Sequence, residues 1–148
     1  RVLLEEVLAA VPPGVDLMLD LKGVDPRLPP AVLRALEGWL PARPLVACAR
    51  NWRVVDALAG VSGLETLHSV GNRIQLAALM RRDPERMRGG VSIRRGLLSP
   101  GVAAALRERT DRLWSWPVDD PATARTLASW GVTGFISDAP HLLRPPGS

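Results

Sequence analysis

Short apolar runs and segments with helical periodicity alternate along the whole chain. The short runs are typical of buried strands, and the other segments repeat apolar residues every three or four positions, as on one face of a helix. The pattern predicts strands at 15–21, 44–49, 64–70, 90–94, 112–118 and 132–137. It predicts helices at 2–11, 31–40, 51–60, 74–82, 100–109 and 121–130. Regular alternation of this kind indicates a parallel sheet covered by helices.

Local signals mark several helix ends. Asn51 and Asp120 are predicted N-caps, and Ser99-Pro100 is a predicted N-cap followed by proline at the first helical position. Gly131 is predicted to be the C′ residue of the helix 121–130. These signals agree with the periodicity, so the sequence predicts an α/β protein.

Two architectures fit this alternation: a doubly wound open sheet and a (β/α)8 barrel. No G-x-G-x-x-G motif or P-loop follows any predicted strand, which removes the main sign of a nucleotide-binding open sheet. Polar residues instead follow the carboxyl ends of the predicted strands, where barrel enzymes build their sites. They are Asp20, Lys22, Arg50, Asn51, Arg94, Asp119 and Asp138. As a set these residues favour the rim of a barrel.

The predicted strand 15–21 carries an acid and a base at its end. Side chains at i and i+2 of a strand point to the same face, so Asp20 and Lys22 project together. Lys22 is the one lysine among nineteen lysines and arginines. A buried acid and base cost several kcal/mol unless they are paired or act on something. A structural ion pair and the edge of an active site both satisfy this requirement.

Composition limits the function classes. The chain has 148 residues, 47% hydrophobic and 23% charged, which is typical of a soluble globular protein. The formal charge is +4, but the arginines are scattered, which favours a solvated basic surface over a nucleic-acid site. The sequence contains no apolar run long enough to predict a membrane span. We therefore expect a soluble protein, with the cytoplasm slightly favoured as its compartment.

Cysteine and histidine give little sign of chemistry. Cys48 is the single cysteine, so there is no disulfide scaffold, and its apolar surroundings predict a buried, inert thiol. His68 and His141 lack metal-ligand spacing to each other or to Cys48. We expect His68 to be a core or rim residue and His141 to belong to the C-terminal tail.

Four segments resemble the glycerophosphodiester phosphodiesterase family. Residues 4–12 and 17–23 (LEEVLAAVP and LMLDLKG) are similar to a helix followed by a strand reading I-E-x-K. Residues 91–93 with Leu97-Leu98 are similar to the family's sixth strand and its sequel. Residues 116–121 (WPVDDP) resemble W-T-V-N-D-P, and 130–140 (WGVTGFISDAP) resemble G-V-D-G-I-I-T-D-x-P.

The resemblance implies a (β/α)8 barrel of which this chain has about six of the eight β/α units, strands three to eight, in residues 1–140. Residues 141–148 would form a tail. The activity implied is hydrolysis of glycerophosphodiesters to glycerol 3-phosphate and an alcohol with a divalent cation, Mg²⁺ or Ca²⁺. Asp20 would be a metal ligand and Lys22 the catalytic lysine. Trp116 and Arg94 are the candidate substrate-binding residues.

The family's H-R-G, E-x-D and H-D motifs, which supply its acid/base histidines and further metal carboxylates, are missing from this chain. We therefore expect little activity from these residues alone and possible self-association through open sheet edges. Three other interpretations stay open: a non-catalytic barrel that serves as a binding or assembly module, another phosphate-handling barrel and, least favoured, a nucleic-acid-binding protein. Nucleic acid is not an expected partner.

Overall fold

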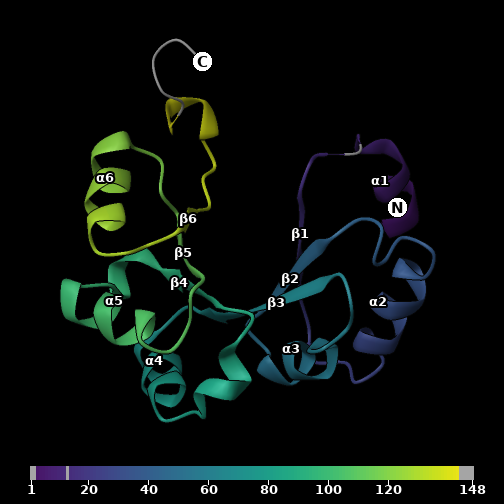
Figure 1. Ribbon diagram of the computed structural model, residues 1–148, viewed down its shortest axis with the longest axis horizontal. Coiled ribbons are helices and arrows are strands. Elements are labelled where there is room, and N and C mark those ends of the chain that lie inside the picture. The colour runs from purple at the N-terminus through teal and green to yellow at the C-terminus, as the bar shows by residue number, and fades with distance from the viewer. Residues whose placement is uncertain (1–2, 13, 144–148) are drawn as a thin grey trace. The chain divides into compact units, whose positions relative to one another are not determined.

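The computed structural model describes residues 3–12 and 14–143, and strands and helices alternate along them as predicted (Figure 1). Six strands form one sheet in the order β1-β2-β3-β4-β5-β6, so each strand pairs with the next along the chain. The strands are β1 (Leu17–Leu21), β2 (Leu45–Ala49), β3 (Leu64–Val70), β4 (Val91–Arg94), β5 (Leu113–Trp116) and β6 (Gly134–Phe135). The α-helices are α1 (Leu4–Ala10), α2 (Leu28–Leu36), α3 (Trp52–Leu58), α4 (Arg73–Met80), α5 (Pro100–Arg107) and α6 (Pro121–Ser129). Short 3-10 helices are η1 (Pro84–Met87), η2 (Arg95–Leu97) and η3 (Pro140–Leu143).

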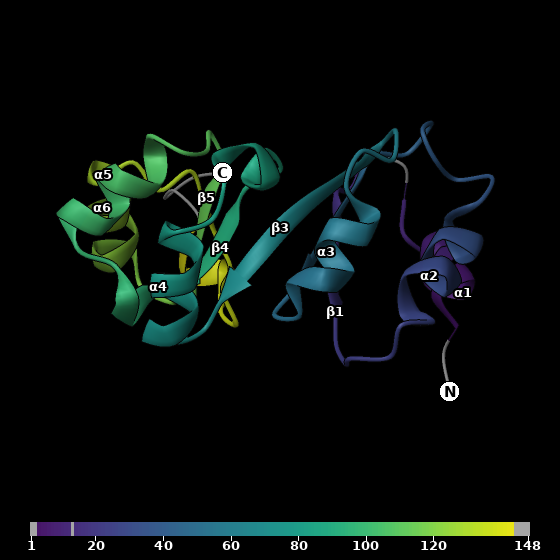
Figure 2. The same ribbon diagram turned by 90° about the horizontal axis from the view of Figure 1, so that it is seen from below.

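The chain divides into two compact units, Arg1–Leu67 and His68–Ser148. The boundary falls inside β3, which is one continuous strand (Figure 2). We call residues 1–67 the first unit and residues 68–148 the second unit.

In the first unit, β1 and β2 are parallel, with Leu17 opposite Leu45 and Leu21 opposite Ala49. The helices α1, α2 and α3 bury Leu8, Leu36 and Leu58 completely or nearly so, and these side chains form one apolar cluster with β2 and the start of β3. The leucines of β1 are only half-buried and pack against that cluster. The core of this unit therefore lies mainly against β2.

In the second unit, the end of β3 pairs with β4, β4 with β5, and β5 with β6, all in parallel. Ile93 of β4 and Leu113 of β5 are fully buried, as are Leu79 of α4 and Leu106 of α5. A side chain at Gly134 would place a Cβ 2.6 Å from the indole of Trp114, so glycine lets this tryptophan lie against β6.

The predicted elements are all present, with differences at their ends. The helix predicted at 31–40 begins earlier, at Leu28, because Pro29 and Pro30 lie in its first turn rather than before it. It ends at Leu36. The strand predicted at 132–137 shortens to Gly134–Phe135, although Thr133 and Ile136 also donate backbone hydrogen bonds to Leu113 and Ser115.

The expectation that 15–21 is a buried strand is wrong. Four of the five residues of β1 are half-buried and Asp20 is exposed. The reason is its place in the sheet: β1 is first in the strand order and pairs with β2 alone among the described strands. A strand with one strand neighbour keeps one edge open to solvent.

The predicted helix caps of the second unit are confirmed. The side chains of Ser99 and Asp120 accept hydrogen bonds from the backbone N–H of Val102 (3.3 Å) and Thr123 (2.8 Å). Gly131 has φ +91° and donates to Ala128, while Val132 donates to Leu127, which is the Schellman arrangement at the end of α6. In the part of the chain that is described, no helix is long and apolar enough to cross a membrane.

Candidate functional site

The acid and base predicted to share a face of β1 do meet. The Lys22 ammonium donates to a carboxylate oxygen of Asp20 at 2.5 Å. The Lys22 side chain is 73% exposed and the Asp20 side chain 49% exposed. The pair therefore carries no large burial cost, contrary to expectation, because water still solvates both groups. An exposed pair of this kind contributes about 1 kcal/mol or less to folding, which leaves both charges available to a ligand.

Cys48 lies beside this pair. In the register of β1 and β2 it is the partner of Asp20, and it is 4% exposed. Burial raises the pKa of the Cys48 thiol to about 12, and the negative charge and hydrogen bonding of Asp20 act in the same direction. The prediction of a buried, inert thiol is confirmed. Its position opposite Asp20 was missed, because register between strands cannot be read from either strand alone.

Asn51 occupies the predicted N-cap position of α3 but does not cap it. Its side chain makes no capping hydrogen bond and instead donates to the carbonyl oxygen of Gly23 at 3.4 Å. This contact joins the segment after β2 to the segment after β1. Asn51 therefore holds the loop that follows Lys22, a role that the predicted cap did not indicate.

The two candidate substrate-binding residues are neighbours in the second unit. Arg94 is the last residue of β4, Trp116 is the last residue of β5, and the two are register partners. Arg94 is exposed and Trp116 is half-buried. A cationic and an aromatic side chain thus stand at the carboxyl ends of adjacent parallel strands.

Asp119 organises the segments that follow β5 and β6. One of its carboxylate oxygens accepts from the Ser137 hydroxyl at 2.8 Å and from the Asp138 backbone N–H at 3.0 Å. The Ser137 oxygen in turn accepts from the backbone N–H of Ala139 at 2.9 Å. The sequence singled out Asp119 and Asp138 as rim residues but missed Ser137, for which only the resemblance at 130–140 gave a signal.

Asp120 serves the helix rather than a ligand. The backbone N–H of Thr123 holds the pKa of the Asp120 carboxyl below its ordinary value, with Arg95 adding a smaller effect in the same direction. The capping role predicted for Asp120 is therefore confirmed.

The two histidines differ in burial. His68 is 2% exposed on β3, which confirms its assignment to the core. His141 is exposed in η3, near the end of the described chain. That neither histidine has a catalytic role remains a prediction.

The described residues do not fit a complete divalent-cation site. Hard cations such as Mg²⁺ and Ca²⁺ take six or more oxygen ligands, several of them from the protein or water. Among the described residues no group of three histidine, cysteine, aspartate or glutamate side chains is placed to hold a metal ion. Asp20 offers one carboxylate, which is fewer oxygen ligands than such a cation takes. No reaction step is therefore assigned to a metal on these residues.

Comparison with solved structures decides the fold. A protein of Silicibacter pomeroyi named as a glycerophosphoryl diester phosphodiesterase superposes with a TM-score of 0.66 at 18% identity, over 85% of this chain and 48% of that protein. A phosphodiesterase of Oleispira antarctica, solved in complex with the product sn-glycerol-3-phosphate, superposes with a TM-score of 0.71 at 16% identity, over 88% of this chain and 54% of that protein. The chain has the glycerophosphodiester phosphodiesterase fold.

That fold is a (β/α)8 barrel of which six parallel strands, with helices between them, are present here. The chain spans about half the length of the two solved structures. No protein-family model and no curated protein sequence matches it. The likeness is therefore one of structure, and the low identity leaves the chemistry to be argued from the residues.

Proposed function

We propose that this chain is part of a domain that hydrolyses glycerophosphodiesters to glycerol 3-phosphate and an alcohol. One observation carries the proposal: the single lysine of the chain stands with Asp20 at the carboxyl end of β1, in a fold shared with two phosphodiesterases. The carboxyl ends of the strands are where (β/α)8 enzymes place their catalytic groups. Residues 1–140 would belong to this domain and 141–148 to a tail.

Lys22 is the proposed catalytic residue. A phosphodiester carries one negative charge, and negative charge gathers on its non-bridging oxygens as the attacking group approaches. A nearby ammonium stabilises that charge. Because the Lys22 side chain is 73% exposed, a phosphodiester can reach it by displacing water. With Lys22 bound to the phosphodiester, the Asp20 carboxylate would be able to bind a metal cation in place of the Lys22 ammonium.

A divalent cation remains a proposal for a domain that adds further oxygen ligands to Asp20. Arg94 and Trp116 are the proposed substrate-binding residues: the guanidinium would bind phosphate oxygens, and the indole would pack on the alcohol moiety. We propose that the 148 residues alone are nearly inactive, because a general acid and base are needed and neither histidine matches the family's H-R-G or H-D motif. His68 is buried in the core and His141 is in η3.

The test measures release of glycerol 3-phosphate from glycerophosphocholine, with Mg²⁺, Ca²⁺ or a chelator. The 148 residues are compared with whatever longer protein the gene encodes. The proposal expects cation-dependent turnover by a longer protein that carries the missing motifs, and almost none by the 148 residues. Turnover by the 148 residues would contradict their proposed inactivity, and failure of such a longer protein would contradict the function.

A matched pair of substitutions isolates Lys22. Lys22–Asp20 and Arg27–Asp25 are both exposed ion pairs between residues two apart, and both lie in the first unit. Lys22→Ala should lower turnover by about 100-fold or more, because one preorganised charge is lost, whereas Arg27→Ala should leave it unchanged. Equal effects of the two substitutions would reduce Lys22 to a structural partner of Asp20.

A non-catalytic binding or assembly module is the alternative. The incomplete cation site and the open edge of β1 favour it. It predicts association of the chain with itself or with another chain through that edge, measurable by sedimentation, and no turnover by any longer form. Binding of nucleic acid would show as an affinity that falls steeply with salt, and we expect none.

A further inference from the structure

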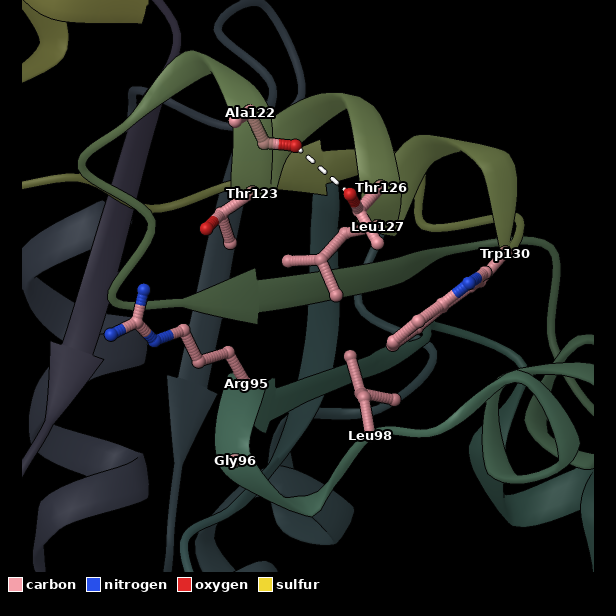
Figure 3. A pocket seen from close by; sticks show the side chains of 8 residues that line it. All are labelled: Arg95, Gly96, Leu98, Ala122, Thr123, Thr126, Leu127 and Trp130. Atoms are coloured by element: carbon pink, nitrogen blue, oxygen red, sulfur yellow. Dashed lines mark hydrogen bonds between the residues drawn. The ribbon is translucent and has the colours of Figure 1, made fainter.

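The lining of a groove in the second unit includes none of the proposed catalytic, metal-binding or substrate-binding residues. It runs between η2 and α6 and has a volume of about 450 Å³ (Figure 3). Small-molecule sites usually have volumes of this order, mostly apolar walls and a few convergent polar groups. The groove is lined by Arg95, Gly96, Leu98, Ala122, Thr123, Thr126, Leu127 and Trp130.

The two ends of this η2–α6 groove differ in chemistry. The Arg95 guanidinium and the Thr123 hydroxyl lie at one end, and Leu98, Leu127 and Trp130 gather at the other (Figure 3). The hydroxyl of Thr126 donates to the carbonyl oxygen of Ala122 at 3.0 Å, so it turns back to its own helix. The groove therefore offers a cation and a hydroxyl at one end and an apolar wall along the rest.

Arg95 makes only a weak ion pair with Asp120. Its side chain is 48% exposed, and its ion pair with Asp120 has a nitrogen–oxygen distance of 3.9 Å. That distance is too long for a hydrogen bond, and an exposed pair of this kind contributes little to folding. The other carboxylate oxygen of Asp120 is held by the backbone N–H of Thr123 at 2.8 Å. The guanidinium thus keeps donors for a ligand.

We propose that the η2–α6 groove binds an amphipathic anion, a single hydrocarbon chain that ends in a phosphate or carboxylate. The anionic head lies against Arg95 and Thr123, and the chain lies along Leu98, Leu127 and Trp130. The apolar part gains affinity by leaving water, and the guanidinium selects against a cationic head. The Asp120 carboxylate opposes the anion, so its removal strengthens binding.

The experiment titrates the 148-residue protein with decyl phosphate below its micelle concentration and follows the indole N–H signal of Trp130 by NMR. Trp130→Phe assigns that signal. Parallel titrations use 1-decanol, decyltrimethylammonium and inorganic phosphate, which separate the contributions of the chain and the head. The expected order of affinity is decyl phosphate first and decanol second, with the cationic and inorganic probes weaker than both.

Two arginine variants complete the test. Arg95→Gln should weaken decyl phosphate binding by about tenfold or more, since a charge-assisted hydrogen bond is lost, and should leave decanol binding unchanged. Arg125→Gln removes an exposed arginine of α6 that does not line the groove and should change neither affinity. Asp120→Asn retains a capping side chain and should tighten decyl phosphate binding.

Several outcomes would overturn the proposal: no binding of decyl phosphate, equal loss in both arginine variants, or equal affinity for decyltrimethylammonium. Inorganic phosphate binding as tightly as decyl phosphate would also overturn it, because the apolar wall would then contribute nothing. None of these readouts depends on hydrolysis or on Lys22, so failure here is distinct from failure of the proposed enzymatic function.

Discussion

The helices of the first and second units begin in different ways. In the first unit, the N-cap positions of α1, α2 and α3 are Leu3, Arg27 and Asn51, and none makes a side-chain capping hydrogen bond. In the second unit, Asn72, Ser99 and Asp120 each accept a backbone hydrogen bond from α4, α5 and α6. A cap stabilises its own helix without tertiary contacts. The second unit is therefore specified more by local sequence, and the first more by packing.

The strands of the two units also differ, in how deeply they are buried. Three of the four residues of β4 are buried, whereas no residue of β1 is. The side chains that carry the proposed chemistry of the first unit thus stand on its least protected strand. Local opening is expected where apolar contacts are few. We infer that the first unit is the less stable of the two, and the following predictions test that inference.

The largest expected effect comes from a cavity in the first unit. Leu58 of α3 and Leu106 of α5 are both 0% exposed, so each is a matched core leucine for its unit. Replacement by alanine should cost about 2–5 kcal/mol in either place. Hydrogen exchange should show that Leu58→Ala exposes the amides of the first unit while those of α5 and β4 stay protected. Loss of protection across both units in Leu58→Ala would contradict the comparison.

In the first unit, a single arginine side chain donates hydrogen bonds to several backbone carbonyl oxygens. The Arg43 guanidinium donates to the carbonyl oxygens of Leu8 (2.8 Å), Val11 (3.0 Å), Pro12 (3.2 Å) and Val15 (3.4 Å). Arg43→Ala should destabilise the first unit by about 1–3 kcal/mol, because the part-buried carbonyls of Leu8 and Val11 lose their donor. Urea unfolding measures the change.

Arg107 provides the control for Arg43. Its guanidinium donates to one carbonyl oxygen, that of Thr110, at 3.0 Å. Arg107→Ala should therefore cost less than Arg43→Ala, about 1 kcal/mol. A loss for Arg107→Ala as large as that for Arg43→Ala would show that the second unit depends on an arginine–carbonyl contact as strongly as the first, and the contrast between the units would weaken.

Two asparagines at equivalent positions give a smaller and sharper test. Asn72 caps α4 by accepting from Gln75 at 2.8 Å, and Asn51 stands at the N-cap of α3 without capping it. Asn72→Ala should cost about 1 kcal/mol, and Asn51→Ala a few tenths. Thermal unfolding of the two variants checks this. Equal losses would mean that the contact of Asn51 with Gly23 is as strong as a cap.

The same asparagines show what sequence could and could not predict. The order of strands and helices follows from hydrophobic period, and the proline and glycine signals at Ser99-Pro100 and Gly131 fix helix ends in the second unit. Asn51 carries the same signal as Asn72, yet its side chain takes a partner 28 residues away. Where a side chain has two possible hydrogen-bond partners, the tertiary structure determines which one it takes. The neighbouring residues in the sequence do not reveal that choice.

The site shows the same limit. The i, i+2 spacing predicts that Asp20 and Lys22 meet, because that contact is local. Their exposure, the position of Cys48 opposite Asp20 and the hydrogen bond from Ser137 to Asp119 all depend on which strand lies next to which. The η2–α6 groove also escaped prediction, because Arg95 and Trp130 are 35 positions apart and neither belongs to a motif that marks a pocket.

The smallest effects come from two carboxylates whose pKa values are lowered for different reasons. The pKa of Asp25, in the first unit, is lowered first by the Arg27 side chain, and the pKa of Asp120, in the second, first by the backbone N–H of Thr123. A carboxyl with a lower pKa in the folded than in the unfolded state stabilises the fold above its ordinary pKa of 3.8. That contribution is lost as the pH falls from there through the folded value.

Salt should separate the two carboxylates. The Arg27 and Asp25 side chains are 87% and 48% exposed, so about 1 M salt should screen their ion pair and raise the pKa of Asp25 toward its ordinary value. The cap at Asp120 is a hydrogen bond to a fixed backbone group, so the pKa of Asp120 should change less. Carboxyl carbon chemical shifts, followed between pH 2 and pH 6 at low and high salt, measure both. A larger change at Asp120 would show that its lowered pKa depends on Arg95 rather than on the cap, and the contrast in local specification between the two units would then fail at α6.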